Sequence, residues 1–187
     1  KGEITSESGN GQTGFEEVLE ALEEAEDNPE VKAILLDMDT PGGSVVATHQ
    51  IVSRIRQVEK PVITWIGEAG ASGGYYAAAA GDYILADPDS ITGSIGVITV
   101  QPKIYELMEK LGIQVDTVQT GELKDIGSPY RELTEEERVL FEALIQESFD
   151  AFVQDIRTFR GEKLNESAFD SVLDGRILSG RQAVDVG

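Results

Sequence analysis

The sequence predicts an α/β domain with a largely parallel sheet. Between Val31 and Val100, short apolar runs alternate with helix-like stretches, which is typical of βαβ units. Glycine-rich turns separate these segments. A chain of 187 residues can bury a core without disulfides or metals. We therefore expect one domain over residues 1–187.

The first elements follow from the spacing of apolar residues. An acidic amphipathic helix is predicted in the first thirty residues, because its apolar positions recur every three or four residues. Residues 31–39 predict a buried strand. From Ser44 the spacing again fits a helix, which ends before Pro61, and residues 61–67 predict the next strand. The apolar positions of the acidic helix are Phe15, Val18, Leu19, Leu22 and Ala25.

Further along, the same patterns predict short elements joined by loops. Residues 70–74 are rich in glycine and lead into an alanine-rich helix over 75–81. Residues 121–131 predict a loop. The remaining predictions in this part of the chain are strands at 82–86, 95–100 and 113–119 and a helix at 103–111.

The C-terminal third is predicted to be mainly helical. Thr134 and Glu137 have the spacing of a capping box, in which each side chain binds the backbone N–H of the other residue. Gly161 ends the long helix that they open. Ser179 begins another helix shortly before Gly187. Both ends of the sequence look cut, so we expect it to be part of a longer protein.

Composition argues against several kinds of chemistry and partner. The sequence has no cysteine and one histidine, so it has no thiol nucleophile and no pair of histidines for a metal site. We expect no metal and no cofactor. The formal net charge of −20 opposes a phosphate backbone, so nucleic acid is not an expected partner. Acidic solvated helix faces explain this charge, and so does adaptation to high salt. No apolar run has the ~20 residues that span a bilayer.

Two glycine-rich turns follow predicted parallel strands, where open α/β folds place their sites. In the first, Gly42 and Gly43 precede a helix, so their backbone N–H groups can bind an oxyanion or a phosphate, or simply form a tight turn. In the second, Ser72 stands among small residues at a sharp junction between strand and helix. That pattern resembles the turn of a nucleophilic serine.

A nucleophilic Ser72 would need a general base. His49 lies within a predicted helix, where packing or solvent exposure is the favoured role. Lysine is the remaining practical base, and Lys124 stands in the loop 121–131. Most loop lysines are solvated and inert, and a lysine acts as a base only where burial or a neighbouring cation favours its neutral amine. The spacing alone is compatible with a solvated, inert Lys124 and with a Lys124 that acts as the general base.

Several separate motifs carry a family resemblance. They are Ala71-Ser-Gly-Gly-Tyr-Tyr, Ile91-Thr-Gly-Ser-Ile-Gly-Val, the segment from Gly121 to Glu137, and the turn Asp37-Met-Asp-Thr-Pro-Gly-Gly-Ser. In this order and spacing they resemble signal peptide peptidase A, a serine protease family with a Ser-Lys dyad. The resemblance runs through residues 1–187 and implies a single protease domain with a crotonase/Clp protease-like fold. Such a fold has repeated β-β-α units, a mostly parallel sheet and helices outside.

The resemblance also implies a role for five residues. Ser72 matches the nucleophile and Lys124 the general base. Ser94 matches the residue that orients the lysine amine. The backbone N–H groups of Gly43 and Gly73 match the oxyanion hole. The net charge of −20 belongs to no family pattern.

The function implied is a serine endopeptidase that degrades remnant signal peptides, bound in extended form, in or at the membrane. The resemblance further implies a membrane anchor outside this chain, an extracytoplasmic location, and a ring-like homo-oligomer in which Ser72 and Lys124 meet between neighbours. Three alternatives stay open. They are a Ser-Lys protease acting on other membrane or capsid proteins, a crotonase-type enzyme binding a CoA thioester, and a noncatalytic assembly module.

Overall fold

A computed structural model describes residues 1–9 and 11–187. Their contacts divide the chain into two compact units, of which the first comprises residues 1–96 with 149–187 and the second comprises residues 97–148. The longest helix, α5 (Glu135–Arg160), contributes residues to both units. Within the described part of the chain, no helix is both long enough and apolar enough to cross a membrane.

The first unit is built on a five-stranded sheet. The central strand β4 pairs in parallel with β3 along one side, and with β5 and then β6 along the other. Strand β7 is antiparallel to β6. The predicted, largely parallel sheet is therefore confirmed. The strands are β3 (Ile34–Thr40), β4 (Val62–Ala71), β5 (Tyr83–Ala86), β6 (Ile91–Gly93) and β7 (Ile177–Ser179).

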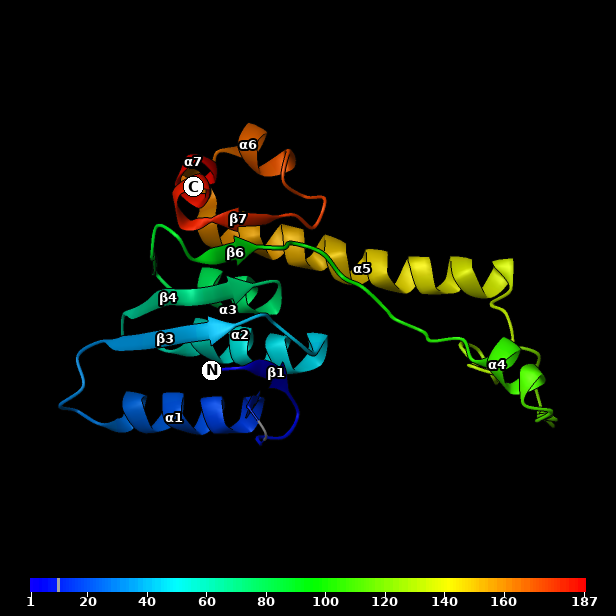
Figure 1. Ribbon diagram of the computed structural model, residues 1–187. Helices are drawn as coiled ribbons and strands as arrows, with labels where there is room; N and C mark the ends of the chain where they lie inside the picture. The colour runs from blue at the N-terminus through cyan, green and yellow to red at the C-terminus, as the bar shows by residue number, and fades with distance from the viewer. Residues whose placement is uncertain (10) are drawn as a thin grey trace. The chain divides into compact units, whose positions relative to one another are not determined.

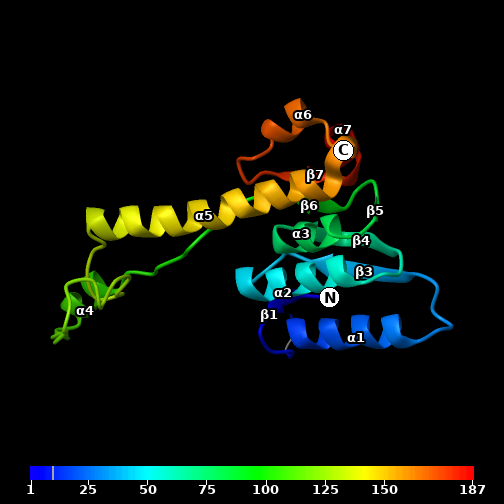
Figure 2. The same cartoon turned by 180° about the vertical axis from the view of Figure 1, so that it is seen from behind.

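Helices α2 (Val45–Gln57) and α3 (Gly73–Ala79) cover one face of this sheet. They lie behind β3 and β4 in Figure 1 and in front of them in Figure 2. Helix α1 (Phe15–Asp27) packs against α2 and buries Leu22. The predicted helices in these places are confirmed, and α3 begins two residues earlier than expected.

Shorter elements complete the first unit. Strands β1 (Glu3–Thr5) and β2 (Gln12–Gly14) form a separate parallel pair. Gly161, with φ of +51°, ends α5 as predicted. A 3₁₀ turn (Gly161–Lys163) and helix α6 (Glu166–Asp170) follow. Helix α7 (Gly180–Val186) begins at the Ser179 cap, as the sequence predicts.

The second unit contains helix α4 (Tyr105–Lys110), which confirms the helix predicted at 103–111. The predicted strands at 95–100 and 113–119 are wrong, because neither segment has a strand partner among the described residues. Strand β6 ends at Gly93, where positive φ values at Gly93 and Ser94 turn the backbone out of the ladder. Apolar alternation supplies the side chains of a strand but not its partner.

Candidate active site

Ser72 occupies a strained turn between β4 and α3. Its φ is 52° and its ψ is −123°, a conformation that residues with a side chain rarely adopt. Its N–H donates to the carbonyl of Gly93 at 2.8 Å, and its carbonyl accepts from the N–H of Tyr76 at 3.0 Å. The side chain is half-buried, and no described residue hydrogen-bonds its hydroxyl. The sheet and α3 thus fix the backbone and leave the hydroxyl available.

Ser94, directly after the neighbouring strand β6, has nearly the same positive φ as Ser72. Among the described residues, it and Ser72 are the two non-glycine residues with positive φ, and the φ of Ser94 is 51°. Ala71 pairs with Gly93 in the register of β4 and β6, so each serine directly follows a paired position. The N–H of Ser94 donates to the carbonyl of Arg176 at 2.8 Å. Both serines therefore leave parallel strands at the same edge of the sheet.

Two backbone donors in this region have no acceptor among the described residues. Ile4 donates its N–H to the carbonyl of Gly42 and accepts from the N–H of Ser44, both at 2.8 Å, which leaves the N–H of Gly43 unpaired. The N–H of Gly73, at the start of α3, is also unpaired. A Cβ on Gly42 would lie 2.7 Å from the nitrogen of Gly73, so the two turns are in direct contact. Neighbouring turns with free donors are what an oxyanion hole needs.

Gly43→Ala is expected to destabilise the first unit by about 2 kcal/mol. The added Cβ would lie 2.0 Å from the carbonyl oxygen of Ile4, so β1 must separate from the turn. Chemical unfolding of both proteins measures the difference. Gly67→Ala is the matched control, because its Cβ would meet no atom closer than 3.7 Å. Equal stability of the two variants would contradict this account of the turn.

His49 packs against the buried ring of Tyr76. The two rings meet edge to face with centroids 5.2 Å apart, and the Tyr76 hydroxyl lies 3.5 Å from Nδ1 of His49. That hydroxyl donates to the carboxylate of Asp155. The pKa of the Tyr76 hydroxyl is raised, mainly by burial and secondly by this hydrogen bond. These contacts agree with the packing role expected for His49.

Lys124 belongs to the second unit, whereas Ser72, Ser94, Gly43 and Gly73 all belong to the first. Its side chain is exposed, and no described residue binds its ammonium group. The N–H of Lys124 donates to the carbonyl of Gly121 at 3.0 Å, which forms a turn. Four of the five predicted site residues therefore belong to the first unit, and the fifth, Lys124, belongs to the second.

A cluster of charged residues joins the loop of Lys124 to the start of α5. Arg131 binds both carboxylate oxygens of Asp125, at 2.9 and 2.7 Å, and both oxygens of Glu137, one of them at 2.8 Å. Glu137 is 1% exposed and accepts from the N–H of Thr134 at 2.9 Å, and its own N–H donates to Thr134 Oγ1. The predicted capping box is confirmed. Sequence reasoning missed Arg131, because nothing in the motif says which carboxylates it selects.

We expect the free energy of unfolding to depend on pH through the carboxyl group of Glu137. Arg131, and then the N–H of Thr134, lower the pKa of this carboxyl from 4.5 to about 2. The unfolded chain therefore binds the proton more tightly, so the stabilisation is present above pH ~4.5 and is lost as the pH falls towards 2. In urea unfolding, we expect the advantage of the wild type over Glu137→Gln to shrink between pH 5 and pH 2.

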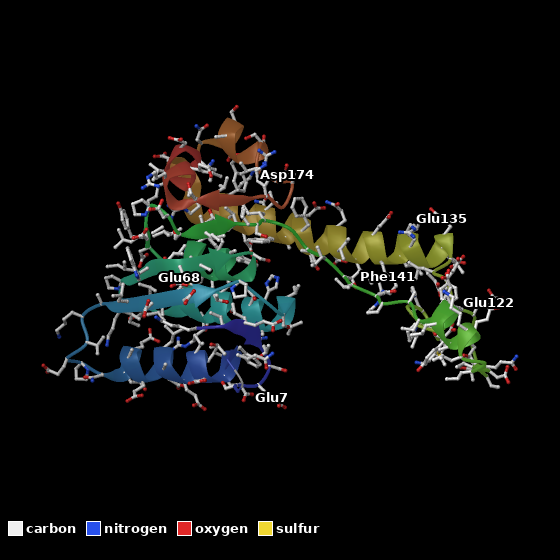
Figure 3. All side chains as sticks on the ribbon, in the orientation of Figure 1. Glu7, Glu68, Glu122, Glu135, Phe141 and Asp174 are labelled. Carbon is white, nitrogen blue, oxygen red and sulfur yellow. The ribbon has the colours of Figure 1, made fainter. Side chains whose placement is uncertain are left out.

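Glu135→Gln is the control, because Glu135 stands at the start of the same helix (Figure 3) and its side chain is 85% exposed. Because this side chain is exposed, its replacement should change the free energy of unfolding only slightly. A constant difference between the wild type and Glu137→Gln would contradict the assignment.

Comparison with known proteins places this geometry in a family. Residues 54–187 match the sequence profile of peptidase family S49, and residues 2–86 match that of Clp protease. A solved structure of a lysine-to-alanine mutant of the 1510-N membrane-bound stomatin-specific protease, in complex with a substrate peptide, covers 100% of this chain and 68% of its own. The TM-score is 0.61 at 21% identity, a likeness of fold. The expected Clp protease-like fold is confirmed.

Two proteins with provisional names are similar to this chain in sequence. The chain is 37% identical over 171 residues to a protease of Methanocaldococcus jannaschii, which covers 90% of this chain and 54% of that protein. It is 34% identical over 179 residues to a signal peptide peptidase SppA of Enterococcus faecium, which covers 94% and 52%. The chain thus spans about half the length of these relatives. With the profile match over residues 54–187, they confirm the resemblance to signal peptide peptidase A, and the chain belongs to peptidase family S49.

Proposed function

We propose that this chain carries the active site of a serine endopeptidase with a dyad of Ser72 and Lys124, and that its two units work together as one protease domain over residues 1–187. One observation carries the proposal. Among the described residues, the hydroxyl of Ser72 has no hydrogen-bond partner, and neither do the N–H groups of Gly43 and Gly73; Ser72 stands on a strained turn next to the turn that holds Gly42 and Gly43. Nucleophile and oxyanion donors are the two parts that acyl transfer needs from one rigid scaffold.

The chemistry follows from these groups. The neutral amine of Lys124 takes the proton of the Ser72 hydroxyl as its oxygen attacks the carbonyl carbon of the peptide bond. The N–H groups of Gly43 and Gly73 stabilise the oxyanion. The lysine ammonium then gives its proton to the leaving amine, and an acyl-enzyme remains on Ser72. Water, deprotonated by Lys124, attacks the ester carbonyl and releases the acid, and the lysine ammonium returns its proton to the oxygen of Ser72. Ser94 orients the lysine amine, and no step needs a metal or cofactor.

The substrates we propose are remnant signal peptides, bound in extended form at the membrane. The name of the Enterococcus faecium relative supports this class. An anchor outside this chain would hold the domain at the extracytoplasmic face. A stomatin is the second candidate substrate, because the protease solved with a substrate peptide is named as stomatin-specific. Comparing cleavage of synthetic signal peptides with cleavage of stomatin segments separates the two.

Covalent trapping is the decisive test of this function. A fluorophosphonate should add to the hydroxyl of Ser72, and peptide mapping by mass spectrometry should locate the adduct there. Ser94→Ala should still be labelled at Ser72, whereas Ser72→Ala should not be labelled at all. A folded, assembled protein that neither reacts nor hydrolyses peptides would contradict the proposal and favour an assembly role.

We further propose that Ser72 of one subunit works with Lys124 of its neighbour in a ring-like homo-oligomer. The sequence has one copy of each motif, and the two residues belong to different compact units. Mixing inactive Ser72→Ala with inactive Lys124→Ala should restore a fraction of wild-type activity, because some interfaces then hold both intact residues. Raised salt should tighten the ring by screening the charge of −20. An inactive mixture with demonstrated subunit exchange would place the dyad within one subunit.

A further inference from the structure

Arg131 ties the loop of Lys124 to helix α5 and holds the carboxylate that follows the lysine. We propose that Arg131 is a positioning residue for Lys124, which fixes the backbone of the lysine and withdraws the negative charge of Asp125 from its amine. This inference rests on the proposed role of Lys124 as the general base. The contacts of Arg131, the anchors of the loop and the charges around the lysine support it.

The contacts of Arg131 account for its whole guanidinium group. Nε and one Nη hold the two carboxylate oxygens of Asp125 at 2.9 and 2.7 Å. Nη2, which also binds Asp125, donates to Oε1 of Glu137, and Nη1 donates to Oε2 of Glu137. Nη1 also donates to the carbonyl of Glu132 at 3.0 Å. The planar guanidinium group of an arginine can form paired hydrogen bonds with two carboxylates at once. The ammonium group of a lysine does not fix the geometry of two carboxylates in this way.

The loop of Lys124 is anchored at two places, both after the lysine in the chain. Downstream, Nζ of Lys103 donates to the carbonyl of Ser128, and the N–H of Ile104 donates to the carbonyl of Pro129, both at 2.8 Å. Next to the lysine, the Arg131 contact with Asp125 is the side-chain anchor. Glu137, which shares this arginine, is almost fully buried at the start of α5. The lysine backbone is therefore connected to a helix through one side chain.

Charge gives Arg131 its second effect. A general-base lysine must lose its proton, and each free carboxylate nearby favours the charged ammonium. Glu122 of the loop and Glu136 of the first turn of α5 line the same hollow as Lys124, and neither has an ion-pair partner in the described part of the chain. Asp125 follows Lys124 directly in the chain, so without Arg131 it would be a third uncompensated carboxylate near the lysine. Arg131 lowers the pKa of Asp125 and compensates its charge, so it adds little to the field at the amine.

The test measures kcat/KM against pH for the full, assembled chain. Arg131→Met alone would leave the carboxylate of Glu137 buried without a positively charged partner and could fail to fold. It is therefore combined with Glu137→Gln, which keeps the capping acceptor. In this profile the acid limb is the rise of kcat/KM with pH as the lysine loses its proton. We expect the midpoint of this limb to lie about 0.5–1 pH unit higher in the Arg131→Met/Glu137→Gln protein than in Glu137→Gln alone. Adding Asp125→Asn should return the limb to within about 0.3 unit, because the released charge is gone.

Two further variants separate positioning from general stability. Arg131→Lys keeps the charge but loses the planar guanidinium group, so kcat should fall about 10-fold with KM within about 2-fold and the limb in place. Arg157→Met is the matched control, because Arg157 also bridges two carboxylates, Glu166 and Asp170, yet is not bound to the lysine loop. Its limb should match the wild type even if its melting temperature falls.

The outcomes distinguish this inference from the proposed function. If Lys124→Ala is inactive but the limb does not move in Arg131→Met/Glu137→Gln, Arg131 has only a structural role and the inference is overturned. A limb that shifts but is not restored by Asp125→Asn would overturn the charge effect. Full activity of Lys124→Ala would remove the proposed dyad, and the positioning role with it.

Discussion

Ser72→Ala is expected to lower peptidase activity by about 10³-fold or more while leaving the fold intact. The loss follows because the hydroxyl is the attacking group, and the oxyanion donors and substrate contacts that remain supply only residual catalysis. Stability should hardly change, because no described residue hydrogen-bonds this hydroxyl. Alanine also keeps the backbone strain that serine already bears at φ of 52°.

Hydrolysis of a fluorogenic peptide by the assembled protein measures this effect, with circular dichroism to check folding. Ser53→Ala is the matched control, since Ser53 is an exposed serine on α2, and it should keep wild-type activity. Turnover near the wild-type rate in pure Ser72→Ala would reject Ser72 as the nucleophile.

Lys124→Ala and Lys124→Arg should both be inactive, with losses of about 10³-fold or more. Alanine removes the base. Arginine keeps the positive charge, but its guanidinium stays protonated throughout the accessible pH range and cannot accept the proton of Ser72. In the wild type, kcat/KM should rise with pH as the lysine amine becomes neutral, and this limb should vanish in both variants.

Lys110→Ala serves as the control for the lysine, because Lys110 is an exposed lysine of the same unit, at the end of α4. Its pH profile should match that of the wild type. A rising limb that survives in Lys124→Ala, at near wild-type rates, would assign the titration to another group.

Much of the fold can be predicted from the sequence, because its signals are local. The apolar stripe of α1, the period of α2 and the buried run of β3 each reflect one element packing against one face. The capping box of Thr134 and Glu137 closes within a single turn of helix, so its spacing is sufficient. The sharp turn at Ser72 follows in the same way from small residues between a strand and a helix.

The site was only partly predictable. The motifs give Ser72, Ser94 and the glycine turns as candidates, and the register of β4 and β6 places the two serines directly after the ends of neighbouring strands. The motifs do not show that Ile4 of β1 pairs with the turn, nor that the N–H of Gly43 is left without an acceptor in the described part of the chain. Nor do they show that Arg131 selects Asp125 and Glu137.

By itself, the sequence determined the periodicity of the helices, the caps, the tight turns and the residue types at the site, since each depends on neighbours a few positions away. The tertiary structure alone decided which strands have partners. Residues 95–100 and 113–119 carry strand-like side chains but pair with no other described segment, whereas the short β7 pairs with β6 from more than 80 positions away along the chain. A strand is stabilised by hydrogen bonds to another segment, and that partner is chosen by the packing of the whole unit rather than by the strand's own residues.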